Sequence, residues 1–248
     1  MKITVITATW NSEKTISDTL SSLNGQTYQN IEYIIVDGNS SDNTLEVAKQ
    51  KCPRVATIIS EPDNGIYDAL NKGINAATGD VVGFLHSDDL FAYPDAVKDM
   101  VDAFKLNDCD AVYADLEYVS RDDINNVVRL WESGEYSKAK LKNGWMPPHP
   151  TFYMKRELYQ KYGLFDLSFR IAADYDSLLR YLWLNNMKMS YLPKVLIKMR
   201  VGGASNGSLK NIIQKTKEDI KALSNNGVPV VRAVIWKNLS KIPQFFIR

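Results

Sequence analysis

The stretch Asp80-Val81-Val82-Gly83-Phe84-Leu85-His86-Ser87-Asp88-Asp89 carries the strongest signal for the fold of this chain. Up to Leu85 it is typical of a buried strand, and two adjacent carboxylates follow directly after the strand ends. Adjacent carboxylates repel each other and lose hydration on burial, so a cation such as Mg²⁺ or Mn²⁺ should offset them. The carboxyl ends of strands are also where open α/β sheets bind ligands. The alternative, which the pair alone makes equally plausible, is that Asp88 caps a turn before Pro94.

Strand and helix signals alternate on both sides of this stretch. Strands are predicted at residues 3–9, 31–36, 55–59, 81–85 and 111–119, with amphipathic helical segments between them. Such alternation predicts an α/β fold with a doubly wound, mostly parallel sheet and right-handed crossovers. From about residue 120 polar loops, a strand at 127–131 and helices at 155–162 and 175–186 predict a smaller lobe that closes over the sheet.

Three parts are therefore expected along the chain. Residues 1–120 form the ligand-binding α/β half, residues 121–206 form a second lobe of the same domain, and residues 207–248 form a helical C-terminal extension. The chain has 248 residues, enough for a substantial core. No internal repeat interrupts this organisation.

Composition excludes several classes of protein. A net charge of +1 gives no overall electrostatic attraction to nucleic acid. Two cysteines in unrelated contexts support neither a disulfide framework nor a zinc site. The first residues lack the regions of a signal peptide, and no apolar run reaches the ~18 residues that span a bilayer. We therefore expect a cytoplasmic protein that is not integral to the membrane; the sequence assigns no oligomeric state.

Acidic residues recur where strands end or chains turn. Besides the Asp88-Asp89 pair, these are Asp37, Asp63 and Asp174. Each has a structural alternative: Asp37 is a turn residue beside Gly38, Asp63 lies in a turn sequence, and Asp174 can cap a helix. Neither a Walker A motif nor a Gly-x-Gly-x-x-Gly motif follows the first strand, so a P-loop or dinucleotide fold is disfavoured.

Taken in order and spacing, several segments resemble family 2 glycosyltransferases, which have the GT-A fold. The resemblance covers residues 1–120 strongly and 145–205 moderately. It is carried by Ile3-Thr4-Val5-Ile6-Thr7-Ala8-Thr9-Trp10-Asn11, Gln26-Thr27-Tyr28, Ile34-Ile35-Val36-Asp37-Gly38-Asn39-Ser40-Ser41-Asp42-Asn43-Thr44, Asn64-Gly65, Asn71-Lys72-Gly73, Gly79-Asp80, Ser87-Asp88-Asp89 and Ile171-Ala172-Ala173-Asp174-Tyr175-Asp176.

The resemblance implies a role for each matching residue. Asp174 would be the general base, and Asp89 would bind the divalent metal. Leu70 departs from the family pattern, in which Arg or Lys is common, so a diphosphate contact is expected from Lys72 or Arg200 instead. Contacts to the nucleotide and donor are implied at Thr7, Thr9, Asp37, Asp63, Asn71, Asp88 and Arg200, and contacts to the acceptor or donor are expected at Tyr67, Asp68 and His149.

The implied reaction is an inverting sugar transfer from a nucleoside diphosphate sugar, a UDP-sugar first, to a hydroxyl of a glycan or lipid-linked acceptor. Bacterial surface polysaccharide or lipopolysaccharide assembly is the implied context. Two alternatives stay open, a nucleotidyltransferase and a non-catalytic sugar-nucleotide-binding module. The tail, residues 228–248, is basic and rich in aromatic residues, so it predicts either peripheral binding at the inner face of the membrane or packing on the domain or a second subunit.

Overall fold

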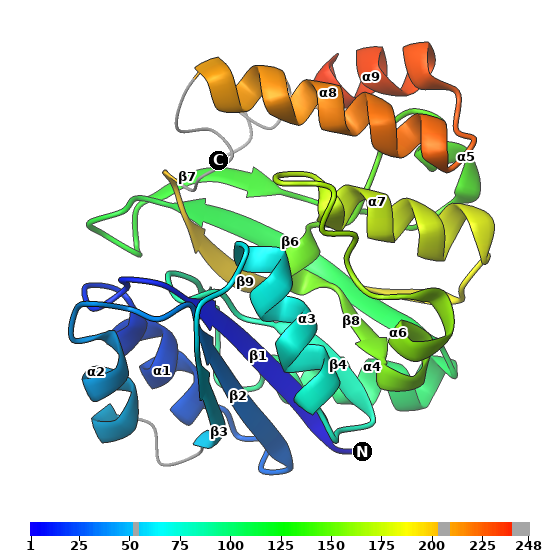
Figure 1. Cartoon of the computed structure of the whole chain (residues 1–248). Coiled ribbons are helices and arrows are strands. Elements are labelled where there is room, and N and C mark those ends of the chain that lie inside the picture. Colours follow the sequence, from blue (N-terminus) through cyan, green and yellow to red (C-terminus); the bar gives the residue numbers. More distant parts are fainter. Residues whose placement is uncertain (52–54, 203–208, 240–248) are drawn as a thin grey trace.

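The computed structural model describes residues 1–51, 55–202 and 209–239, and Figure 1 shows them as helices packed on both faces of one twisted sheet. Among the described residues the sheet has nine strands in the order β3-β2-β1-β4-β8-β6-β9-β5, with β7 paired to β6.

The amino-terminal half is the parallel part of the sheet. It consists of β1 (Ile3–Thr9), β2 (Ile31–Asp37), β3 (Val55–Ser60) and β4 (Val81–Phe84). β1 lies between β2 and β4, so Ile3 pairs with both Ile31 and Val81. All seven residues of β1 are buried, which fits its unbroken apolar and threonine sequence. The predicted doubly wound α/β sheet is confirmed here.

The second half adds antiparallel pairings. β6 (Ala111–Val119) runs parallel to β9 (Met189–Arg200), whereas β8 (Tyr153–Lys155) is antiparallel to both β4 and β6. β5 (Leu90–Phe91) and β7 (Val127–Trp131) are also antiparallel to their neighbours. The short β8 therefore joins the two halves into one sheet.

Gly83 is what lets β8 lie against β4. A Cβ at Gly83 would overlap the ring of Tyr153, which is fully buried. The glycine in the middle of an otherwise apolar strand thus marks a close approach between neighbouring strands.

Two apolar clusters separate the faces of the sheet because side chains alternate along each strand. Ile3 and Val5 face the cluster covered by α1 (Ile16–Asn24), α2 (Thr44–Lys51) and α4 (Ala96–Asn107). Ile6 and Ala8 face the other cluster. The helices over that second face are α3 (Ile66–Ala76), α5 (Lys138–Leu141), α6 (Arg156–Tyr162), α7 (Ala173–Leu179), α8 (Leu209–Asn225) and α9 (Val230–Leu239).

The second lobe differs from the prediction in detail. The helix expected at 155–162 begins at Arg156, because the preceding residues form β8. The helix expected at 175–186 is α7 followed by a π-helical turn, η2 (Arg180–Leu184). A single 3₁₀ turn, η1 (His149–Thr151), precedes β8. Within the described ranges, none of the helices is both long and apolar enough to cross a bilayer.

Candidate active site

Thr7 and Thr9 lie at the carboxyl end of β1 and are both buried. The hydroxyl of Thr7 donates to the carbonyl of Leu85 (2.5 Å) and accepts from the hydroxyl of Tyr33 (2.7 Å), so it links β1 to β2 and to the residue that follows β4. The buried hydroxyl of Thr9, by contrast, has no hydrogen-bond partner in the described structure. Thr9 is therefore the better placed of the two to meet a ligand.

Asp37 is the last residue of β2, and Asp63 lies in the loop that follows β3. The fully buried carboxylate of Asp37 accepts from Ser40 Oγ (2.5 Å), Ser40 N (3.1 Å) and Ser60 Oγ (2.8 Å). Asp63 accepts from the N–H of Gly65 (2.8 Å). Its other oxygen would lie 2.5 Å from a Cβ at Gly38, so the glycine allows the two loops to touch. These contacts support the turn interpretation of both acids; their contact with a nucleotide stays a prediction.

The Asp88-Asp89 pair is tied to the end of β9. Arg200 donates to the carbonyl of Asp88 (2.9 Å) and forms an ion pair with Asp18 (2.5 Å). Asp88 and Arg200 line a cavity of about 370 Å³ together with Ser87, Asn11 and residues of the loop after β1. The guanidinium of Arg200 is thus already engaged by two partners beside the carboxylate pair.

Asp89 has the features of a cation ligand. It is 1% exposed, and its Oδ2 has no hydrogen-bond partner within the described residues. Burial raises the pKa of Asp89 well above its ordinary value, and the charge of Asp88 raises it further, while Arg200 opposes both. The described residues hold no group of three or more His, Cys, Asp or Glu side chains suited to a metal. Two carboxylates completed by substrate phosphates match the way Mg²⁺ is usually bound, so these residues fit such an ion.

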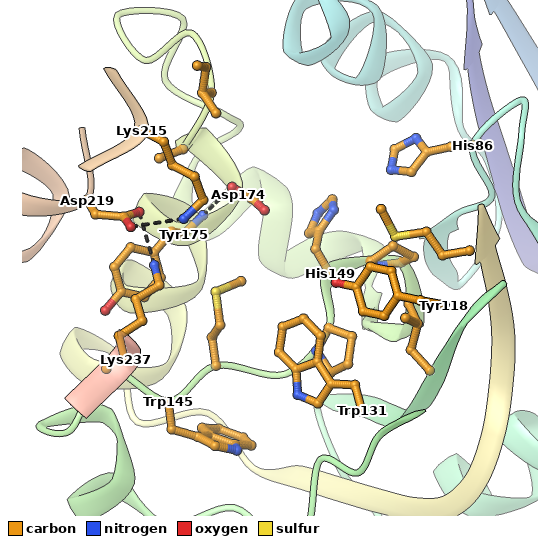
Figure 2. Close-up of a pocket in the computed structure, with 18 of the residues that line it drawn as sticks. His86, Tyr118, Trp131, Trp145, His149, Asp174, Tyr175, Lys215, Asp219 and Lys237 are labelled. Carbon is orange, nitrogen blue, oxygen red and sulfur yellow. Dashed lines mark hydrogen bonds and ion pairs between the residues drawn. The ribbon is translucent and has the colours of Figure 1, made fainter. Parts of the chain in front are cut away.

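A second cavity, of about 450 Å³, brings Asp174 together with His86 and His149 (Figure 2). His86 directly precedes the Ser87-Asp88-Asp89 segment, so this cavity adjoins the end of β4. His149 stacks on Phe84 with ring centroids 5.1 Å apart, and burial lowers the pKa of His149 to about 4. His149 is therefore neutral near pH 7, and it lies on the cavity wall as well as in the aromatic core.

Tyr67 makes the polar contact to Asp174. Its hydroxyl donates to Asp174 Oδ1 (3.1 Å) and to the carbonyl of Ile171 (2.6 Å). Burial raises the pKa of Tyr67 well above 10, and the charge of Asp174 adds to the effect, so the phenol stays a donor. The N–H of Tyr175 also donates to Asp174 Oδ1 (2.8 Å). The structure thus brings Tyr67 and Asp174 together, as a contact between protein side chains.

Asp68 and Asn71 occupy structural positions on α3. Asp68 accepts from the N–H of Asn64 (3.0 Å) at the start of the helix. Asn71 makes two hydrogen bonds to the backbone of Phe165, each 2.9 Å long. They fasten α3 to the loop before α7, and the donor contacts predicted for Asp68 and Asn71 stay predictions.

One wall of the cavity comes from residues that the sequence analysis did not single out. Lys215 and Asp219 on α8 and Lys237 on α9 form it. The Asp219 carboxylate pairs with Lys215 at 3.1 Å and with Lys237 at 3.0 Å. Figure 2 marks both pairs with dashed lines. Lys237 also lies over the ring of Tyr175, 3.3 Å from its centroid. Other walls are aromatic, with Tyr118, Trp131 and Trp145.

α9 reaches this wall because Gly144 has no side chain. Gly144 has a φ of +69°, and a Cβ there would overlap the carbonyl oxygen of Ala233. A signal for the wall does exist in the sequence. Glu218 and Asp219 share one helical face with Ala222 and Leu223. A face that carries apolar residues next to acids is unusual for a helix face exposed to solvent, so it indicates packing on the domain.

Comparisons with known proteins show the family to which this chain is similar. The family described as glycosyl transferase family 2 matches residues 4–171. An uncharacterised glycosyltransferase of Mycobacterium tuberculosis is 34% identical over 180 residues, which cover 72% of this chain and 68% of the relative.

Two solved structures share the fold. S. aureus TarS 1-349 in complex with UDP-GlcNAc superposes with a TM-score of 0.72 at 21% identity, covering 90% of this chain and 67% of that one. The mannosyltransferase PcManGT from Pyrobaculum calidifontis, in complex with GDP-Man and Mn²⁺, gives a TM-score of 0.69 at 18% identity, covering 99% and 73%. In a longer TarS chain the match spans 39% of the length.

Proposed function

Because this chain belongs to glycosyl transferase family 2, we propose that it transfers a sugar, with inversion, from a nucleoside diphosphate sugar to an acceptor hydroxyl. The observation that carries the proposal is the 450 Å³ cavity, where Asp174 faces the same space as His86 at the end of β4. A carboxylate that opens onto a cavity next to a carboxylate pair suits a reaction with one general base and one anionic leaving group.

Each end of this arrangement has its own task. Asp174 takes the proton from the attacking hydroxyl while Tyr67 occupies its Oδ1. Asp89, with Asp88 beside it, would hold a divalent cation, Mg²⁺ or Mn²⁺, which when bound stabilises negative charge on the leaving diphosphate. The unpartnered buried oxygen of Asp89 supports this assignment. Bringing both substrates together contributes through proximity.

We propose a UDP-sugar as the donor, with its base and ribose near Thr7, Thr9, Asp37 and Asp63. The unpartnered hydroxyl of Thr9 supports this placement. The solved relatives bind different nucleotides, UDP-GlcNAc in TarS and GDP-Man in PcManGT, so the base is a property to measure. Asp88, Asn71 and Arg200 complete the proposed donor contacts. Tyr67, Asp68 and His149 are proposed as further contacts to the acceptor or the donor.

The acceptor that we propose is a glycan or a lipid-linked glycan of a bacterial surface polysaccharide or lipopolysaccharide. The aromatic walls formed by Tyr118, Trp131 and Trp145 support a carbohydrate, because aromatic rings offer flat apolar faces together with polar edges. Along the chain, we propose that residues 1–120 bind the donor and that residues 121–206 bind the acceptor and supply the base. Residues 207–248 form an extension.

We further propose peripheral contact of the extension with the inner face of the cell membrane, in the cytoplasm. One face of α9 packs on the domain through Ala233, while Val231, Ile235 and Trp236 are at least half exposed, at 75%, 52% and 50%. An exposed apolar face beside Arg232 suits the headgroup region of an anionic bilayer. The residues predicted to continue this segment, 240–248, lie outside the described residues.

Liposome co-sedimentation tests the membrane contact. Changing Val231, Ile235 and Trp236 together to Ser should reduce pelleting with anionic vesicles at low salt. Leu106→Ser removes an 84% exposed apolar side chain from α4 and serves as the matched control. Equal pelleting of the triple variant, the control and the wild type would refute the contact.

The proposed reaction is tested by calorimetry with a panel of nucleotide sugars, with and without Mn²⁺, followed by a donor hydrolysis assay. We expect one nucleotide sugar to bind more tightly with Mn²⁺ and to be hydrolysed slowly. Metal-dependent binding without any turnover would favour a non-catalytic sugar-nucleotide-binding module instead.

A further inference from the structure

Glu218 on α8 binds the backbone of the loop that leads into Asp174, while Lys221 on the same helix donates to Ser168 Oγ (3.0 Å) earlier in the loop. Three consecutive N–H groups, those of Arg170, Ile171 and Ala172, all donate to the carboxylate of Glu218, at 3.1, 2.7 and 2.9 Å. Glu218 is therefore the acceptor for three consecutive backbone amides, which lie 46 to 48 residues earlier in the chain.

Glu218 is built into this position. It is 4% exposed, and Gln214 donates to its Oε1 (2.8 Å) from one helical turn earlier. Burial favours the neutral acid, but the hydrogen bonds from Gln214 and from the three amides outweigh it and lower the pKa of Glu218 below its ordinary value. The side chain is therefore a carboxylate at neutral pH, and charged acceptors form the stronger hydrogen bonds.

The same loop is held from the opposite side by α3. The hydroxyl of Tyr67 donates to the carbonyl of Ile171 (2.6 Å) and to Asp174 Oδ1 (3.1 Å). Ile171 thus has its N–H bound to Glu218 and its carbonyl bound to Tyr67. With both groups fixed, the backbone that carries Asp174 has little freedom to move relative to the cavity.

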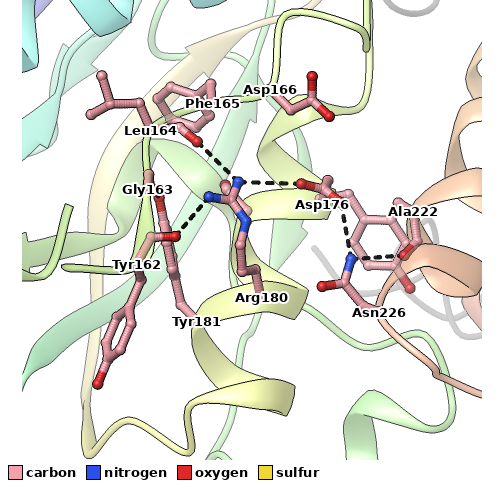
Figure 3. Close-up of polar contacts among 12 residues, drawn as sticks. Tyr162, Gly163, Leu164, Phe165, Asp166, Asp176, Arg180, Tyr181, Ala222 and Asn226 are labelled. Atoms are coloured by element: carbon pink, nitrogen blue, oxygen red, sulfur yellow. Dashed lines mark hydrogen bonds and ion pairs between the residues drawn. The ribbon is translucent and has the colours of Figure 1, made fainter. Parts of the chain in front are cut away.

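A second contact reaches α7 from Asn226, the residue that directly follows α8 (Figure 3). Asn226 donates to Asp176 Oδ1 (2.9 Å), while Asp176 Oδ2 pairs with Arg180 (3.2 Å). Arg180 in turn donates to the carbonyls of Tyr162 and Leu164, at 2.8 and 2.9 Å. Glu218 on α8 and Asn226 directly after it therefore hold the loop before α7 and the first turn of α7, respectively.

From these contacts we infer that Glu218 is a positioning residue, which sets the place of Asp174 for proton abstraction. The inference rests on the proposed function of Asp174. It assigns part of the reaction geometry to α8, which lies beyond the residues 4–171 that match the family. A helix of the C-terminal extension thereby belongs to the catalytic unit.

Kinetics of donor hydrolysis test this role, using the nucleotide sugar selected by calorimetry together with Mn²⁺. Glu218→Ala should lower kcat by roughly 10–100-fold, because small displacements of a catalytic group cost about that much. Glu218→Gln keeps one oxygen that can accept from the loop and should retain more activity. The donor Kd should stay unchanged in both. Glu157→Gln, the same change at an exposed acid on α6, is the matched control and should behave as wild type.

A double-variant comparison separates positioning from a general loss of structure. If Glu218 acts through Asp174, Glu218→Ala should have no further effect on kcat once Asp174→Asn is present. An equal loss of kcat in both backgrounds, or a parallel loss of donor affinity, would overturn the inference.

Hydrogen exchange gives a readout that does not depend on turnover. Amides of the peptide that covers 168–176 should exchange faster in Glu218→Ala than in Glu157→Gln, and unchanged exchange would contradict the inference. Failure of the wild type to bind or hydrolyse any nucleotide sugar would refute the proposed function, and the positioning role with it. Normal turnover in both wild type and Glu218→Ala would refute the positioning role alone.

Discussion

Replacing Asp174 by Asn should separate catalysis from binding. The two donors to this carboxylate, Tyr67 Oη at 3.1 Å and Tyr175 N at 2.8 Å, both reach Oδ1. An Asn side chain can keep its amide oxygen in that place and accept from both. Its NH₂ group then takes the place of Oδ2. An amide NH₂ group cannot accept the proton of the acceptor hydroxyl.

The magnitudes follow from this orientation. Because the two hydrogen bonds persist and only lose their charge, the free energy of unfolding should fall by about 1 kcal/mol or less. The rate should lose the whole contribution of the base, roughly 10²–10⁴-fold. That loss corresponds to about 3–5 kcal/mol of transition-state stabilisation. The effect on the rate should therefore far exceed the effect on stability.

The measurement combines three readouts on the purified variant: kcat with the donor found by calorimetry, donor Kd with Mn²⁺, and thermal unfolding. Asp122→Asn, an exposed acid in the turn after β6, is the control. The reasoning is refuted if Asp174→Asn turns over within a few-fold of wild type. It is refuted equally if donor affinity collapses, because Asp174 would then belong to the nucleotide site.

Three further perturbations test other parts of the structure. Asp89→Asn should cost about 3 kcal/mol of transition-state stabilisation without loss of fold; near-normal metal-dependent turnover would remove Asp89 as the ligand. For Glu32, burial favours the neutral acid, but hydrogen bonds from Lys2 and its neighbours outweigh it and lower the pKa from 4.5 to about 2. Its carboxylate therefore stabilises the fold above about pH 4.5, and this stabilisation is lost as the pH falls toward about 2. Glu32→Gln should accordingly lower the unfolding free energy by roughly 2–3 kcal/mol at pH 7, with a deficit that shrinks over this window in denaturant titrations; a deficit independent of pH would contradict the assignment. Gly83→Ala should lower the unfolding free energy by about 1–3 kcal/mol or more, since the new methyl group would overlap the buried ring of Tyr153. A melting temperature equal to that of wild type would show that β8 can shift to make room for the methyl group.

The sequence predicted several strands well, because each is rich in apolar and β-branched residues. Strands expected at 3–9 and 111–119 have those bounds in the structure. β5 was not predicted and β8 had no predicted bounds, since two and three residues are too few to show a period of two. The insertion of β8 between β4 and β6 depends on pairing across many residues, which local patterns do not encode.

The candidate site was predicted in part for the same reason. Asp88 and Asp89 follow a strong strand signal, and Asp174 precedes a helix, so short-range patterns indicate all three. Glu218 was missed because an acid in a lysine-rich helix usually faces solvent. Only the tertiary structure shows that it binds amides near Asp174. The cavity wall from Lys215 and Lys237 likewise depends on helices distant in sequence from the sheet.

The hydrogen bonds from the segment before Asp174 to Glu218 on α8 set a limit on how proteins built like this one can diversify. Substitutions in the cavity wall, for example at Lys215 and Lys237, can suit a new acceptor and leave the proposed base and metal ligands unchanged. An extension that replaces α8 must still offer an acceptor to the amides of residues 170–172. A graft of a foreign extension onto residues 1–202 should therefore be active only when it brings an equivalent of Glu218.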